Sequence, residues 1–333
     1  MFTRMDEFST RPPRLAFLLL RGLDHFAQDL IALLPHQSGW DVRPFHVSGP
    51  ADLEAALAWT DRPDRDAVWF EFCWPPFPAL IAQTGFGGRR VIVRVHRIEA
   101  METPHVAQTP WHKVDDLIVV SSDMARRVRR VAPEVDQSTR LHCIYNGLDI
   151  DRFAPLADWN PFRIGWCGLM TLRKNPVLAL QVLFALRVQD ERYHLHVCGN
   201  GGEVLATETF FHLARHLDLM DAVHMDGTLP PRAMPDWHAR NGVLLHTSLH
   251  ESFGYAIAEA AAAGCDIALL EHPGAAEFWP AARRFGTVDE AVWLVRNARP
   301  HRWRDHVVRN FSLARQIAAT AALLQSPSFA SAS

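Results

Sequence analysis

Two glutamates separated by seven residues are the most informative acidic side chains in this sequence. Glu251 and Glu259 lie in the run HESFGYAIAEAAAAG, which covers residues 250–264. Ser252 suits a helix N-cap and Gly264 suits the position after a helix end, so the run predicts a helix that is small and apolar on nearly every side. Such a helix is buried.

The two glutamates then have different surroundings. Glu259, in the second turn of a buried helix, needs a polar partner, which the hydroxyls of a polyol ligand or an arginine could supply. Glu251 precedes the helix, beside backbone N–H groups at Phe253 and Gly254 that suit a phosphate.

A pair of cations forms a second cluster. Arg173 and Lys174 occur in the run GLMTLRKNP, residues 168–176, between a predicted strand and a predicted helix. Two adjacent cations at such a junction can neutralise a diphosphate group. Lysine is rare in this chain, which has only Lys113 and Lys174, so the use of lysine here favours a functional role over a solvated helix start.

The elements that must position these residues alternate between short apolar runs and helical patterns. This alternation is typical of βαβ units and a parallel sheet. Strands are expected at 15–20, 42–47, 67–72, 91–95, 117–120, 141–144, 163–167, 194–198, 223–225, 242–246 and 267–270. Helices are expected at 25–34, 51–59, 122–131, 176–188, 210–217, 252–263, 288–297 and 303–324.

The pattern restarts after a proline-containing tract, FAPLADWNP, at residues 153–161. We therefore expect an α/β protein with two doubly wound domains, residues 1–155 and 156–302, followed by a C-terminal helix over 303–325. Two such domains facing one another would leave a ligand cleft between the carboxyl ends of their strands.

Composition excludes several classes of protein. With 48% hydrophobic residues, 21% charged residues and a formal net charge of -3, the chain has no global attraction for nucleic acid. No run approaches the roughly 20 apolar residues of a membrane helix, and the first apolar run does not fit a signal peptide. The five cysteines are widely spaced, and Cys143, Cys167 and Cys198 fall within strand-like runs where a thiol is a small buried hydrophobe. We expect a reduced, cytoplasmic protein.

Six segments, in order, resemble glycosyltransferase family 4, whose retaining enzymes have the GT-B fold of two facing Rossmann-like domains. They are VDDLIVVSSDMARRV, YNGLD followed by Phe153, GLMTLRKNP, VHMDG, ARNGVLLHTS and the helix run with its E-x7-E spacing. The resemblance covers about residues 89–280. It implies a retaining, metal-independent hexosyltransferase that uses a nucleotide-diphosphate sugar, needs no cofactor, and acts on a glycan or lipid-linked acceptor in cell-surface polysaccharide or glycolipid synthesis.

The resemblance also implies roles for individual residues. Glu251 would contact the donor sugar, Glu259 the ribose, and Lys174 with Arg173 the diphosphate. One departure is Leu169, where many members carry another arginine. Further donor contacts would come from Ser252, Phe253, Gly254, Tyr255, Gly199, Gly201 and Gly22.

Other expectations concern the acceptor side. His96 follows a strand, and in the resembling family a histidine there approaches the donor sugar and the acceptor. Glu99 and Glu102 are weaker acceptor-side candidates, and Glu277 falls beside a later donor loop.

Two apparent metal motifs are set aside. Asp149 and Asp151 form a D-x-D, but it lies within the NGLD segment and does not end a nucleotide-binding strand. His194 and His196 lack a third ligand at useful spacing. We expect no metal site.

A basic stripe formed by Arg126, Arg129 and Arg130 is either a solvated helix face or a contact with anionic lipid, which would place the protein at the inner membrane face.

Three alternatives stay open. One is a nucleotide-sugar epimerase or hydrolase of the same fold, and another is a catalytically idle scaffold protein. A nicotinamide-dependent dehydrogenase is disfavoured because no G-x-G-x-x-G follows the first strand.

Overall fold

The computed structural model describes residues 11–23, 27–62, 64–154 and 159–327. The chain divides into two compact units. The first contains residues 1–145 together with 316–333, and the second contains residues 146–315. The boundary at Tyr145 therefore precedes the tract expected to be the linker, part of which, residues 155–158, lies outside the described residues.

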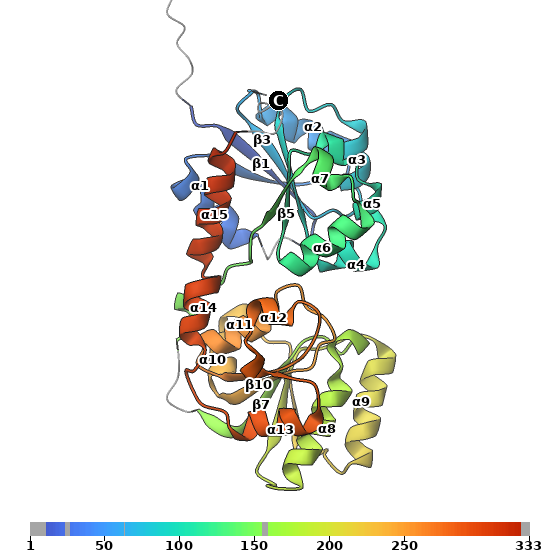
Figure 1. Cartoon of the computed structure of the whole chain (residues 1–333), viewed down its shortest axis with the longest axis vertical. Coiled ribbons are helices and arrows are strands. Elements are labelled where there is room, and N and C mark those ends of the chain that lie inside the picture. The colour runs from blue at the N-terminus through green and yellow to red at the C-terminus, as the bar shows by residue number, and fades with distance from the viewer. Residues whose placement is uncertain (1–10, 24–26, 63, 155–158, 328–333) are drawn as a thin grey trace, which may run out of the picture. The chain divides into compact units, whose positions relative to one another are not determined.

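The first unit is built on a six-stranded parallel sheet in the order β2-β1-β3-β4-β5-β6 (Figure 1). Its strands are β1 (Arg14–Leu19), β2 (Asp41–His46), β3 (Ala67–Glu71), β4 (Arg90–Val95), β5 (Asp116–Val119) and β6 (Arg140–Cys143). β3, β4 and β5 are buried along their whole length, as expected for strands covered on both faces. The edge strand β6 leaves Cys143 exposed, so the expectation of a buried thiol there was wrong.

Helices connect these parallel strands, as in βαβ units. They are α1 (Gln28–Ser38), α2 (Pro50–Trp59), α3 (Phe77–Gln83), α4 (Arg97–Glu102), α5 (His105–Gln108), α6 (Ser122–Val131) and α7 (Val135–Ser138). The side chain of Ser121 caps α6 by accepting a hydrogen bond from the backbone N–H of Met124. The sequence patterns predicted α1, α2 and α6 and missed the four short helices.

The second unit repeats the plan with a parallel sheet in the order β12-β11-β10-β7-β8-β9. Its strands are β7 (Asn160–Cys167), β8 (His194–Cys198), β9 (Val223–Gly227), β10 (Asn241–His246), β11 (Asp266–Leu270) and β12 (Arg284–Phe285). Its helices are α8 (Pro176–Arg187), α9 (Val204–His216), α10 (Met234–Ala239), α11 (Tyr255–Ala262), α12 (Ala275–Phe278), α13 (Val288–Arg296) and α14 (Arg304–Phe311). In Figure 1, β7 and β10 lie between α10, α11 and α12 on one side and α8 and α13 on the other.

The two parallel sheets and their helices confirm the predicted α/β class. The expected C-terminal helix is two helices, because Ser312 interrupts it between α14 and α15 (Leu313–Gln325). Within the described residues, no helix is long and apolar enough to span a membrane.

A buried charge cluster holds the end of α15 in the first unit. Asp116 is wholly buried at the start of β5 and accepts hydrogen bonds from Arg90 Nε (2.6 Å), Arg140 Nε (3.0 Å) and His142 Nε2 (2.7 Å). Arg90 also donates to the carbonyl oxygen of Ser326 (2.8 Å). Burial alone would raise the pKa of Asp116, but the bonds from His142, Arg90 and Arg140 lower it to about 2.

Asp116→Asn should destabilise the first unit by about 3 kcal/mol at pH 7, because it leaves two arginines beside an uncharged partner. The lowered pKa means that the charge of Asp116 stabilises the fold above the unfolded pKa near 4 and loses this effect as the pH falls towards 2. The difference between wild type and variant should therefore shrink by about 1 kcal/mol at pH 3. Urea unfolding, monitored by hydrogen exchange in peptides of β4 and β5, measures this difference in the free energy of unfolding.

The matched control is Asp136→Asn, which removes an exposed partner of Arg129. Its unfolding should match the wild type. Equal effects of the two substitutions would show that the Asp116 cluster does not hold this unit together.

Candidate functional site

The carboxyl edge of the second sheet brings together the loops that follow β7, β8 and β10. β7 is central: the chain leaves it towards β8 and β9 and then returns to place β10 on its other side. This reversal is a topological switch point, where open α/β sheets bind ligands. Arg173 and Lys174 follow β7, and Glu251 follows β10, so the fold places the cations and the acid on either side of the switch point.

A short turn fixes the two cations. Thr171 caps a 3-10 turn over Leu172–Lys174 by accepting a hydrogen bond from the backbone N–H of Lys174 (3.3 Å). The loop after β10 bonds to the same turn: Leu249 N–H donates to the carbonyl of Arg173 (2.9 Å), and Thr247 Oγ1 donates to that of Lys174 (2.8 Å). The turn and the loop therefore form one hydrogen-bonded unit.

Both cations bind one carboxylate oxygen. Lys174 Nζ lies 2.6 Å and Arg173 Nη1 lies 2.9 Å from Glu251 Oε1. Arg173 Nη1 also donates to the carbonyl oxygen of His250 (3.1 Å). The side chains of Glu251, Lys174 and Arg173 are 13%, 16% and 30% exposed, so the cluster is accessible from one side. The second oxygen of Glu251, Oε2, accepts no hydrogen bond from the described residues.

The charges around Glu251 keep it ionised. Burial would raise its pKa, but Lys174, His246 and Arg173 together hold the pKa well below its ordinary value. His246 Nε2 lies 3.7 Å from Glu251 Oε1. Burial, more than any charge, lowers the pKa of His246 to about 4, so this imidazole is neutral at pH 7. The site therefore contains two cations, one carboxylate and one neutral imidazole.

Glu259 lies at the start of the second turn of α11, as expected, and is 24% exposed. It is therefore half-buried, although the helix around it is mostly buried. Its structural partner is a histidine and not the arginine that the sequence left open: Glu259 Oε2 is 3.4 Å from Nε2 of the fully buried His238. Neither ring nitrogen of His238 forms a hydrogen bond in the described parts of the chain.

The start of α11 corrects one expectation. The N-cap is Gly254, in the left-handed region with φ 81°, and not Ser252. Phe253 is only 4% exposed and packs against Phe278 (ring centroids 5.5 Å apart) and Phe311 (5.4 Å), so its side chain belongs to the core, and the donor contact expected of its backbone N–H stays a prediction. Ser252, Gly254 and Tyr255 are partly exposed. Gly264 follows the helix with φ 88°, which confirms the predicted helix end.

The glycine loop after β8 is bonded to the loop that carries the cations. Met170 N–H donates to the carbonyl of Gly201 (3.0 Å). A Cβ at Gly199 would lie 2.2 Å from the carbonyl oxygen of Gly168, so only glycine fits. A Cβ at Gly168 would in turn lie 3.1 Å from Cε of Lys174. Gly199 and Gly168 therefore set the position of the lysine, while Gly201 is exposed.

Cys167 is the last residue of β7 and lies opposite Cys198 of β8. Its pKa is raised well above the ordinary value by a hydrogen bond with Cys198 and by burial, and also responds to the charges of Glu259 and Lys174.

The first unit holds the remaining candidates. His96 is the N-cap of α4, and its Nε2 lies 3.0 Å from Oε1 of Glu71. Glu71 is fully buried and also accepts from Arg94 Nη1 (3.1 Å) and Trp69 Nε1 (2.8 Å). Burial would raise the pKa of Glu71, but Arg94 and His96 lower it. His96 is thus held in place by a buried carboxylate.

Beside this histidine the backbone is strained. Phe72 has φ 106°, a conformation that costs energy for an aromatic residue, and its ring contacts that of His96 (4.6 Å between centroids). Glu99 is fully buried; Oε1 accepts from Cys73 N–H (3.1 Å), whereas Oε2 has no partner in the described residues, and burial raises the pKa. Glu102 is exposed and pairs with Arg97, and Gly22 lies in an exposed turn with φ 81°.

Two other sequence motifs have structural partners. Asp149 accepts from Asp151 N–H (3.3 Å) and pairs with Arg152 (2.9 Å), as a turn residue would. His196 bonds to Asp226 (3.0 Å). Among the described residues no group of three or more His, Cys, Asp or Glu side chains is arranged to hold a metal ion.

The basic stripe on α6 is partly neutralised. Arg126 pairs with Asp123 (3.1 Å), and Arg129 pairs with Asp136 (2.9 Å). This arrangement favours a solvated helix face.

Sequence reasoning missed several residues of the two sites. Glu71 is the last residue of β3 and Arg94 the last but one of β4, and a charge within each largely apolar run was the available signal. No sequence signal identified His246 or His238, because their importance depends on the packing of residues distant along the chain.

The fold is similar to those of several solved structures. Sucrose-phosphate synthase from Thermosynechococcus elongatus is 15% identical, with a TM-score of 0.72, over 94% of this chain and 98% of that chain. HepE from Anabaena, in complex with UDP and glucose, is 15% identical, with a TM-score of 0.69, over 94% and 99%. A glycosyltransferase from Rickettsia africae is 12% identical, with a TM-score of 0.68, over 94% and 98%. These similarities confirm the GT-B fold.

Comparison of the sequence with curated proteins gave no match. Residues 149–282 match the model of the family described as "Glycosyl transferases group 1". The matched residues are fewer than half of the chain and all belong to the second unit, where they include Lys174, Glu251 and Glu259.

Proposed function

We propose that this protein is a retaining glycosyltransferase that transfers a sugar from a nucleotide-diphosphate sugar to a hydroxyl group of a glycan or lipid-linked acceptor. The observation that carries the proposal is the cluster of Lys174, Arg173 and Glu251 at the topological switch point of the second sheet. The family match over the same residues and the GT-B fold support it. HepE, which has a similar fold, was crystallised with UDP-glucose, so uridine nucleotides are the first donors to test.

The ion pairs of Glu251 with Lys174 and Arg173 suggest how a donor binds. Lys174 and Arg173 share one oxygen of Glu251, so a diphosphate can replace that carboxylate as their partner. Glu251 then retains two oxygens that accept hydrogen bonds from sugar hydroxyls. Glu259, half-buried on α11, accepts hydrogen bonds from the ribose hydroxyls in the same proposal.

The same cations serve the chemical step. The bond between the anomeric carbon and the diphosphate oxygen breaks, and negative charge develops on the diphosphate beside Lys174 and Arg173. A diphosphate oxygen takes the proton of the acceptor hydroxyl, which attacks on the face that the diphosphate leaves, so the configuration is retained. His96 in the first unit is proposed for the acceptor side, held by Glu71.

Lys174→Ala should weaken the binding of both UDP and inorganic pyrophosphate by tenfold or more, because each presents the diphosphate to this amine. It should also lower kcat/KM by roughly 10²- to 10³-fold. Calorimetric titration and initial rates measure these effects. Lys113→Ala, which removes the other lysine of the chain, is the matched control. Equal affinities of the two variants for pyrophosphate would contradict the proposal.

Glu259→Gln should distinguish the contribution of the ribose to donor binding from that of the diphosphate. We expect about tenfold weaker binding of UDP, because an amide replaces an anionic hydrogen-bond acceptor, and unchanged binding of pyrophosphate. Glu208→Gln, an exposed substitution on α9, is the control and should bind both ligands like the wild type. If Glu259→Gln binds UDP normally, Glu259 does not contact the ribose.

Incubation with donor alone tests the alternative enzymes. An epimerase or hydrolase would convert UDP-glucose without an acceptor, whereas a transferase should leave most of it intact until an acceptor hydroxyl is supplied. An idle scaffold protein would neither bind nor convert any donor.

Chelation tests the metal-independent mechanism. Because two side-chain cations replace a metal ion at the diphosphate in this proposal, EDTA should leave the transfer rate unchanged. Loss of activity that manganese restores would mean that a metal ion takes part and that the reading of Asp149 and Asp151 has to be revised.

A further inference from the structure

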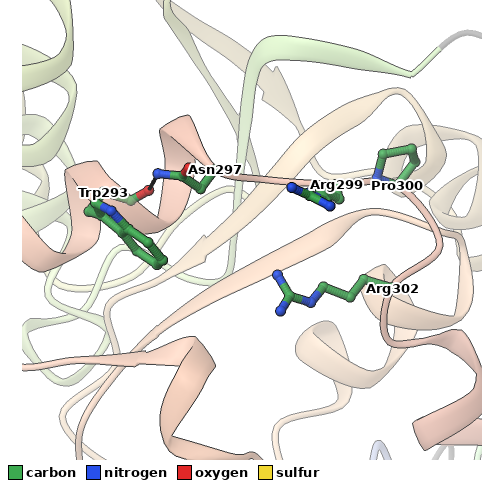
Figure 2. Close-up of a pocket in the computed structure, with 5 residues that line it drawn as sticks. All are labelled: Trp293, Asn297, Arg299, Pro300 and Arg302. Atoms are coloured by element: carbon green, nitrogen blue, oxygen red, sulfur yellow. Dashed lines mark hydrogen bonds between the residues drawn. The ribbon is translucent and has the colours of Figure 1, made fainter.

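A cavity of about 590 Å³ lies in the second unit, away from the candidate site. It is lined by Trp293, Asn297, Arg299, Pro300 and Arg302 (Figure 2). The cavity follows the C-terminal end of α13, and the backbone N–H of Arg299 donates to Asp266 Oδ2 (2.8 Å) at the start of β11. The start of a strand marks the amino edge of the sheet, whereas Lys174 and Glu251 lie at the carboxyl edge. The cavity is therefore separate from the proposed donor site.

The charge in this cavity is positive and not compensated. Among the described residues, neither Arg299 nor Arg302 forms an ion pair through its guanidinium group. Asp266 is fully buried and already pairs with the buried Arg283 (3.1 Å). The charge of Arg302 is felt at Arg283, whose pKa is lowered mainly by burial and also by this neighbour. The guanidinium of Arg302 lies over the ring of Trp303, 5.5 Å from its centroid. Two guanidinium groups without an ion pair favour a ligand with a carboxylate or phosphate group.

The other side of the cavity has an exposed aromatic ring. Trp293 is 59% exposed, an unusual environment for the largest apolar side chain. Figure 2 shows its indole facing the space into which Arg302 extends. The apolar face of a sugar ring packs well on such a surface, and the cavity volume is sufficient for one or two sugar rings.

Asn297 adds a polar group beside the ring. Its Nδ2 donates to the carbonyl oxygen of Trp293 (2.8 Å), which fixes the amide and leaves Oδ1 to accept from a ligand hydroxyl. The lining thus combines a flat apolar face, a hydroxyl acceptor and two anion-binding groups.

We propose that this cavity is a binding site for an anionic saccharide, one or two sugar rings that carry a carboxylate or phosphate group. The sugar ring packs on Trp293, a hydroxyl donates to Asn297, and the anionic group binds Arg299 and Arg302. The proposal does not depend on transferase activity, because it rests on residues outside the proposed donor site.

Calorimetric titration of the full chain tests this site with five probes: glucose 6-phosphate, a glucuronic-acid disaccharide, maltose, inorganic phosphate and UMP. We expect one or both anionic saccharides to bind and maltose and phosphate to bind at least about tenfold more weakly. The first two probes distinguish a phosphate group from a carboxylate group as the anion that the arginines recognise.

Variants assign the binding to the cavity. Trp293→Ala and Arg302→Gln, both at exposed positions, should each weaken saccharide binding by about tenfold or more. Arg296 lies on α13, as Trp293 does, but outside the cavity lining. Arg296→Gln is the matched control and should leave saccharide binding unchanged. Lys174→Ala should also leave this binding unchanged, which separates it from the proposed donor site.

Four outcomes would overturn the proposal. They are the absence of binding by both anionic saccharides, equal binding of inorganic phosphate, saccharide binding that Trp293→Ala and Arg302→Gln leave intact, and tighter binding of UMP that the same two variants abolish. The last result would identify a nucleotide site instead.

Discussion

The position of Glu251 between two cations is the interaction on which the second unit's site depends. A half-buried lysine and arginine side by side repel each other, and their desolvation is costly unless an anion compensates. Glu251 compensates both through one oxygen. The arrangement keeps the cations in place before any ligand binds, so a diphosphate meets groups that are already oriented.

Backbone hydrogen bonds around the cluster explain why Arg173, Lys174 and Glu251 lie so close together. The turn over Leu172–Lys174 bonds to the loop after β10, and the glycine loop after β8 bonds to the loop before that turn. Three loops from neighbouring strands therefore support one another. Gly199 and Gly168 are required here for space, since a side chain at either would meet backbone or the stem of Lys174. The position of the amine is thus a consequence of main-chain packing.

The first unit also places a carboxylate, Glu71, among cationic and hydrogen-bonding side chains, but this carboxylate is wholly buried. Glu71 is fully buried beneath Arg94, His96 and Trp69, and all three donate to it. No part of this carboxylate is accessible, so it cannot exchange its partners for a ligand as Glu251 can. Its effect is to hold His96, which is 14% exposed, in one orientation. One acid is therefore suited to binding and the other to positioning.

Most of the fold followed from local patterns, and the failures have identifiable physical causes. Buried parallel strands are continuous apolar runs, so the sequence identified eleven of the twelve strands, and only the two-residue β12 was missed. Short helices such as α4 and α10 have too few residues for a periodic pattern. The predicted N-cap at Ser252 failed because Gly254, which adopts a left-handed conformation, begins the helix two residues later. Phe253 could not be assigned to the core because its partners, Phe278 and Phe311, are distant in the sequence.

The arginines at the two edges of the second sheet differ in whether a carboxylate already forms an ion pair with them. At the carboxyl edge Arg173 forms an ion pair with Glu251. An anionic ligand must replace Glu251 before the ligand can pair with Arg173. At the amino edge the nearby carboxylate of Asp266 is occupied by Arg283 and by the backbone of Arg299. Arg299 and Arg302 therefore attract an anion directly, and solvent screens them more because they are exposed. Selectivity at the first edge comes from exchange of partners, whereas at the second it must come from the shape and apolar surface that Trp293 provides.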